Sequence, residues 1–148
     1  MISAIVSSLH VLALALGLPA VFLRGRALKG ALNGDGLRRL PAADNVWGLA
    51  AVLWIVTGLL RAFGGLEKGT EFYLQSRLFW VKMALFASVL LLEIRPMVTF
   101  IRWRRRLARG QSVDTSSARS LYTINHVELA IVVILVFVAS FMARGFGH

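Results

Sequence analysis

The sequence predicts an all-α protein, a four-helix transmembrane bundle with both termini outside and its basic loops in the cytoplasm. Hydrophobic residues make up 57% of its 148 residues, and its mean hydropathy is +0.71. A soluble domain is usually ~45–50% apolar, so this excess calls for a lipid solvent. The net charge of +10 comes largely from arginines in short segments between the apolar runs. We therefore predict one four-helix transmembrane domain over residues 1–148.

Each of four apolar runs is long enough to cross the membrane, which takes about 20 residues in a helix. The expected spans are about residues 2–23, 45–63, 74–95 and 121–143. The first run differs from a signal peptide because its positive charges follow the apolar stretch instead of preceding it. The third is expected to continue past Pro96 to Arg106, because membrane helices tolerate proline. Asp44 is expected to be the N-cap of the second helix, after irregular structure rich in glycine.

The distribution of basic residues predicts the orientation. The first and third connections are basic, whereas the second carries only Lys68, with Arg61 and Arg77 at its flanks. The positive-inside rule places the two basic connections in the cytoplasm. The basic residues of these two connections are Arg24, Arg26, Lys29, Arg38 and Arg39 in the first, and Arg95, Arg102, Arg104, Arg105, Arg106, Arg109 and Arg119 in the third.

Composition excludes several classes of site. The chain has no cysteine, which excludes disulfides, thiolate metal sites and covalent attachment of a c-type heme. The high positive charge suggests nucleic acid as a partner. No basic face with interleaved aromatic residues exists outside the apolar runs, however, so the predicted partner is the lipid bilayer and not nucleic acid.

Two polar residues are expected to share one depth in the membrane. His10 lies eight residues into the first helix and Lys82 eight residues into the third. At 1.5 Å per residue, both lie roughly 12 Å below the outer surface. His10 shares a helical face with the small residues Ser3, Ser7, Ala13 and Gly17, and small residues mark the packing faces of membrane helices. The sequence therefore predicts that His10 and Lys82 form one intramembrane constellation.

A buried carboxyl in the fourth span also needs an explanation. Glu128 could pair with an arginine or with Lys82, or mark a proton path, because an unpaired charge inside a membrane is unfavourable. On the same helix His126 is expected to share a face with Tyr122, while Asn125 and Glu128 point elsewhere. Four other charged residues lie near helix ends, where long side chains can reach the interface. They are Arg61, Arg77, Glu93 and Arg95.

Residues along most of the chain match the sequence pattern of a known protein family. They are Asp44, Trp47, Gly48, Gly58 and Arg61 in the second helix, Lys68, Gly69, Phe72 and Tyr73 after it, Phe79, Lys82, Pro96, Phe100, Arg102 and Trp103 in the third helix, and Glu128, Leu129, Met142, Ala143, Arg144 and Gly145 in the fourth. With these motifs the chain resembles a family of bacterial predicted membrane proteins of unknown function. The resemblance implies a location in the bacterial inner membrane.

That family is more distantly similar to the HemJ-type protoporphyrinogen oxidase and to the CopD-type copper-resistance membrane domain. HemJ-like proteins carry a histidine in the first helix and a lysine in the third, and His10 and Lys82 match these positions. They also carry a histidine two residues before the lysine, where this chain has Trp80. Where the closer family more often has a small polar residue, this chain has Glu93.

Two hypotheses of function remain. In the first, the bundle binds heme b or a porphyrin, with His10 as the axial metal ligand. Lys82, Arg61 and Arg77 would then hold propionates, and Lys82 and Glu128 are the candidate catalytic residues. In the second, the protein is a non-enzymatic membrane subunit or a small transporter, as a homo-oligomer or within a larger complex, and its polar residues stabilise the bundle or line a path.

Overall fold

The computed structural model describes residues 1–30, 32 and 34–147, and all regular structure in these residues is helical. The helices are α1 (Ile2–Lys29), α2 (Gly34–Phe63), α3 (Thr70–Gln75), α4 (Arg77–Ala108) and α5 (Ala118–Ala143). By length and composition, α1, α2, α4 and α5 can each cross a membrane. The predicted four-helix transmembrane architecture is therefore confirmed.

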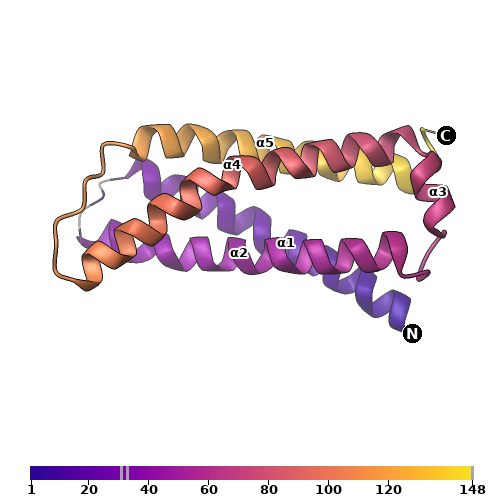
Figure 1. Ribbon diagram of the computed structural model, residues 1–148, viewed down its shortest axis with the longest axis horizontal. Coiled ribbons are helices and arrows are strands. Elements are labelled where there is room, and N and C mark those ends of the chain that lie inside the picture. Colours follow the sequence, from indigo (N-terminus) through magenta and orange to yellow (C-terminus); the bar gives the residue numbers. More distant parts are fainter. Residues whose placement is uncertain (31, 33, 148) are drawn as a thin grey trace.

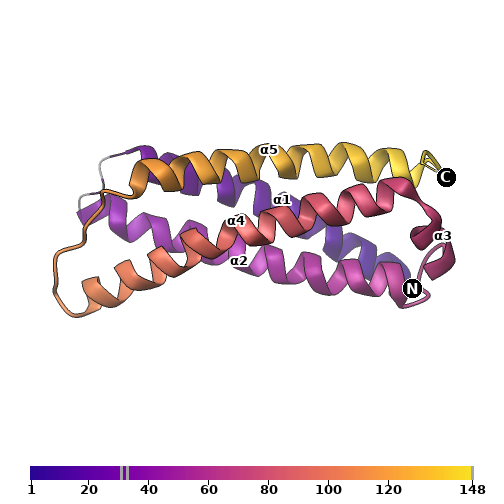
Figure 2. The ribbon, with the colours of Figure 1, turned by 45° about the horizontal axis from the view of Figure 1, so that its top comes forward.

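The four long helices lie side by side along the long axis of the molecule (Figures 1 and 2). α1 packs against α2 and α5, and α4 packs against α5. One end of the bundle carries both chain termini and α3, and we call it the terminal end. The opposite end carries the α1–α2 connection and residues 109–117, and we call it the basic end. Large apolar side chains such as Leu91 and Phe137 face outward, as expected for a lipid-facing surface.

All four long helices extend beyond the predicted spans, and the third of them begins at Arg77 and not at residue 74. α4 continues through Pro96 to Ala108, as predicted. α2 begins at Gly34, so Asp44 lies inside this helix and the prediction that it is the N-cap was wrong. The early start has a packing reason, because Leu40 is buried in an apolar cluster at the basic end. The other buried members of this cluster are Leu28, Phe100, Trp103 and Leu121.

Two further apolar clusters fill the bundle. The middle one contains Ala20, Val21, Trp47, Val89 and Val132. The one at the terminal end contains Ala62, Tyr73, Phe79 and Met142, so it ties the short helix α3 to the bundle. Between the middle cluster and the terminal end, the packing leaves an internal cavity.

Candidate functional site

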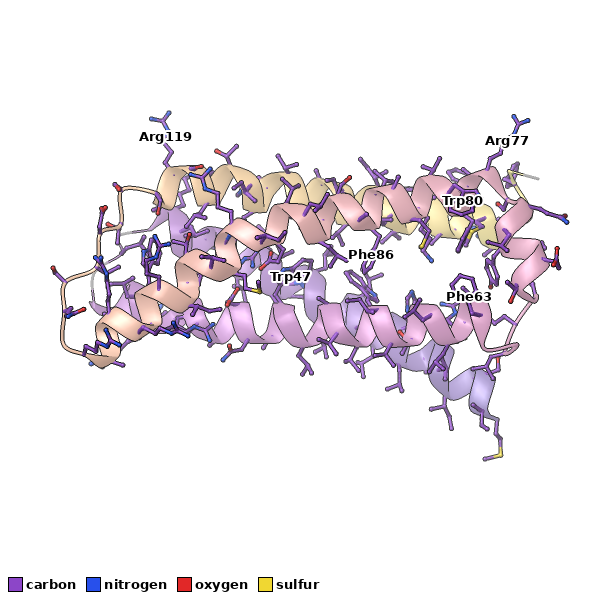
Figure 3. All side chains as sticks on the ribbon, viewed as in Figure 1. Trp47, Phe63, Arg77, Trp80, Phe86 and Arg119 are labelled. Carbon is purple, nitrogen blue, oxygen red and sulfur yellow. The ribbon has the colours of Figure 1, made fainter. Side chains whose placement is uncertain are left out.

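A cavity of about 480 Å³ lies inside the half of the bundle nearer the terminal end. All four long helices and α3 contribute to its wall, which is mostly apolar and aromatic. Phe86, for example, points from α4 towards α2 (Figure 3). The polar or charged side chains in the wall are His10, Arg61, Tyr73, Lys82 and Ser140. Ligand sites in proteins commonly have this makeup, a largely apolar wall with a few placed polar groups.

The structure brings together His10 of α1 and Lys82 of α4 in the wall of this cavity, and Arg61 of α2 joins them. Arg77 does not line it: its side chain is exposed and points away from the bundle (Figure 3). Arg77 precedes Lys82 by five residues, which on a helix turns it roughly 140° away. Arg77 is therefore no longer a candidate to hold a ligand here. Glu128 lies outside the cavity wall as well, so the two candidate catalytic residues belong to separate sites.

The hydrogen bonds of His10 identify its tautomer. Its Nδ1 lies 2.7 Å from the hydroxyl oxygen of Thr57. That hydroxyl donates its single proton to the carbonyl of Leu53 at 2.5 Å, so it can only accept from His10. This arrangement favours the tautomer in which His10 Nδ1 carries the proton and Nε2 keeps its lone pair in the neutral imidazole. The indole of Trp54 also donates to the backbone carbonyl of His10, at 3.2 Å.

Lys82 is the uncompensated cation of the cavity. In the part of the chain that the structure describes, its ammonium has no hydrogen-bond or ion-pair partner. An ammonium removed from water without a partner is unfavourable. Arg61, by contrast, is paired with Glu67, with its Nε 2.7 Å from a carboxylate oxygen. The cavity therefore presents one free positive group and one neutral imidazole to a guest.

Glu67 gathers three donors at the terminal end of the cavity. Besides Arg61, it accepts from the hydroxyl of Ser7 at 2.8 Å and from the phenol of Tyr73 at 2.7 Å. Burial raises the pKa of Glu67, but the bonds from Arg61, Tyr73 and Ser7 outweigh burial and bring the pKa to about 2. Burial and the bond to Glu67 raise the pKa of Tyr73 to about 12. An ionised Glu67 thus joins α1, α2 and α3 beside the cavity.

Glu67 is not among the site residues that were predicted from the sequence. The residue lies in the connection between two spans, where a carboxylate is ordinarily solvated. Its hydrogen bonds reach six residues along the chain to Arg61 and Tyr73, and sixty residues to Ser7. No helical spacing relates these positions, so no sequence signal could have found the cluster.

A second polar site occupies the half of the bundle nearer the basic end, and Arg24 of α1 is at its centre. Two Arg24 nitrogens bind Glu93, at 2.7 and 2.9 Å. Arg24 also donates to Glu128 at 2.5 Å, to Asn125 at 2.7 Å and to Asp44 at 3.2 Å. We call these five residues the Arg24 cluster. They come from all four long helices, so the cluster joins the whole bundle.

Two neighbours extend the Arg24 cluster. The indole of Trp47 donates to Glu93 at 3.0 Å, and Arg104 donates to Asp44 at 2.7 Å. Trp47 in turn packs edge-on against Trp54, with ring centroids 6.2 Å apart. Because Trp54 lines the cavity, this tryptophan pair lies between the two polar sites.

The Arg24 cluster corrects two predictions from the sequence and decides the partner of Glu128. Arg24, counted among the cytoplasmic loop charges, is fully buried. Glu93, expected to reach the interface, binds Arg24 and Trp47. Glu128 pairs with an arginine and not with Lys82. His126 is exposed, and the inward stripe of α5 is instead Leu121, Asn125, Glu128 and Val132. The helical spacing of this stripe was the available signal.

These features define a class: a four-helix membrane protein with an internal cavity and a buried ionic cluster. The chain belongs to the family described as "Predicted membrane protein (DUF2214)", which it matches over residues 2–147. Comparisons with curated proteins and with solved structures give no match.

Proposed function

We propose that the cavity binds heme or a porphyrin, with His10 as the axial ligand of a bound iron and Lys82 facing a propionate. The observation that carries this proposal is the hydrogen-bond chain from His10 through Thr57 to Leu53, which leaves His10 Nε2 as a free lone pair. Histidine ligands of metals usually donate their other ring N–H to a neighbouring oxygen, which fixes the tautomer and raises the basicity of the ligand.

The rest of the wall fits such a guest. A volume of about 480 Å³ lies within the range of ligand pockets, which is ≈ 300–1,000 Å³. Trp54, Phe79 and Phe86 offer aromatic surface to a flat macrocycle, and Met83 adds a thioether. Neutral imidazole is a common axial ligand of heme iron, and a bound heme would supply one-electron redox chemistry.

Lys82 gives the cavity its preference for anions. A propionate beside its ammonium would supply the counter-charge that the protein itself does not provide. Arg61 already shares its charge with Glu67, so it contributes less to an anionic guest. We therefore expect Lys82 to affect retention of the ligand and His10 to affect its coordination.

The test is the visible spectrum of protein produced with ample heme and purified in a bilayer mimic. Bound heme should give a Soret band. His10→Ala should abolish this band or change its position, whereas Lys82→Gln should lower heme retention without moving the band. His126→Ala is the matched control, because His126 is exposed on α5; its spectrum should equal that of the unaltered protein. Colourless protein, or a band that survives His10→Ala unchanged, would contradict the proposal.

The second candidate function is a non-enzymatic membrane subunit or a small transporter. The observation that favours it is the Arg24 cluster, which joins all four long helices without touching the cavity. If the protein is colourless, the polar residues of the cavity would be assigned to a path or to bundle stability.

A further inference from the structure

Glu128 has a carboxylate oxygen that the Arg24 cluster does not satisfy. In the described part of the chain, Oε1 of Glu128 is buried and has no hydrogen-bond partner, and the residue is fully excluded from solvent. Arg24 cannot supply a donor, because all five of its N–H groups are used. They bind two oxygens of Glu93 and one oxygen each of Glu128, Asp44 and Asn125.

The charges around Glu128 do not balance when every carboxyl is ionised. Three members of the cluster have a carboxyl group: Asp44 from α2, Glu93 from α4 and Glu128 from α5. Two cations oppose them, Arg24 from α1 and Arg104 from α4. The excess is one negative charge in a low-dielectric interior, where an uncompensated charge is strongly unfavourable. One bound proton removes this excess.

Glu93 and Glu128 are placed to share that proton. One nitrogen of Arg24 donates to Oε2 of both residues, at 2.9 and 2.5 Å. Carboxyl groups this close favour a state in which only one of them is ionised. The Glu93 side chain is 19% exposed, whereas that of Glu128 is fully buried, so Glu93 is the more accessible of the two carboxyl groups.

We propose that the Arg24 cluster is a proton-binding site, in which Glu93 and Glu128 together hold one exchangeable proton inside the membrane. The ligand is the proton itself. Binding transfers H⁺ from water to a carboxylate oxygen of Glu93 and onward to Glu128, and no electron moves. This proposal does not depend on heme, because neither glutamate lines the cavity.

Infrared difference spectroscopy of protein in lipid nanodiscs tests it, because a protonated carboxylic acid has its own C=O stretching band. We expect this band near neutral pH and its loss as the pH rises. Glu128→Gln and Glu93→Gln should each abolish it, since either change leaves two carboxylates facing two arginines. Glutamine imitates the neutral acid, so both variants should stay folded, which circular dichroism checks.

Glu67→Gln is the control, because Glu67 is ionised and lies near the terminal end of the cavity; the band should remain in full. Labelling glutamate with ¹³C should shift the band, which separates Glu93 and Glu128 from Asp44. Three results would overturn the proposal: no band near neutral pH in folded protein, a band that survives both glutamine substitutions, or a band that ¹³C-glutamate does not shift.

Discussion

Arg24 and Glu128, separated by 104 residues in the chain, lie 2.5 Å apart with both side chains fully buried. Their bond connects α1 with α5, the first and last of the long helices. Charge pairs of this kind depend on each partner for compensation, because neither side chain can turn to water. The pair therefore holds α1 and α5 in a fixed position relative to each other.

Removing Arg24 should destabilise the bundle strongly. Arg24→Gln leaves Asp44, Glu93 and Glu128 with Arg104 as their remaining cation. Breaking a buried ion pair from one side typically costs about 3–5 kcal/mol. Arg26→Gln is the matched control, because Arg26 is exposed two residues later on the same helix, and we expect at most about 0.5 kcal/mol there. Unfolding in mixed detergent micelles measures both, and equal stabilities of the two variants would refute the structural role of Arg24.

Two helical glycines should respond in opposite ways to alanine. A methyl group at Gly25 would lie 2.7 Å from the Asn125 amide nitrogen, which itself bonds to the Val21 carbonyl. Gly25→Ala should therefore destabilise the α1–α5 contact by about 1–3 kcal/mol, the usual cost of overpacking. A methyl group at Gly48 meets nothing within 4 Å. Gly48→Ala should be neutral or stabilise α2 by up to about 1 kcal/mol. The same unfolding assay compares the two variants. If Gly25→Ala leaves the stability unchanged, the close approach of α1 and α5 at Gly25 is contradicted.

The phenol of Tyr73 should lose its proton only at a higher pH than an ordinary tyrosine does. Its pKa is about 12 in the folded protein and about 10 when unperturbed. The folded pKa is raised, so the stability from this group is fully present below pH ~10 and is lost as the pH rises through the folded pKa. Phenolate absorbance in a Tyr122→Phe background isolates Tyr73, since the chain has two tyrosines.

Glu67→Gln should bring the pKa of Tyr73 down towards its ordinary value, because it removes the negative charge beside the phenol. Burial continues to raise the pKa, so the return should be partial. An identical midpoint with and without Glu67→Gln would show that Glu67 does not influence Tyr73.

Orientation in the membrane remains a prediction from the basic residues. Both termini and α3 should lie outside, and the basic end should face the cytoplasm. Alkaline phosphatase is active only outside the cytoplasm, so a fusion after Phe63 should be active and one after Gly110 inactive. The opposite pattern would reverse the topology.

Some features of the fold and of the candidate site could be predicted from the sequence. Hydropathy locates the spans because a backbone in lipid must satisfy its hydrogen bonds internally, which makes a long apolar run helical. Counting residues along the expected helices predicted one depth for His10 and Lys82. Both residues line the cavity, although α4 begins at Arg77, so Lys82 lies five residues into its helix and not eight. The same rise per residue did not reveal that Arg77 turns away, because the face of a residue matters as well as its depth.

The apolar runs of the sequence were sufficient to predict the four helices, and its arginines were sufficient to predict the basic segments between them. Whether charged side chains near helix ends turn outward or inward depends on how the helices pack together. Arg24 and Arg26 look alike in the sequence, yet Arg24 is fully buried and Arg26 is exposed. The difference arises because Arg24 meets Asp44, Glu93 and Glu128 from three other helices. Local periodicity carries no information about these distant partners, and the balance between hydration and pairing is set only when the helices pack.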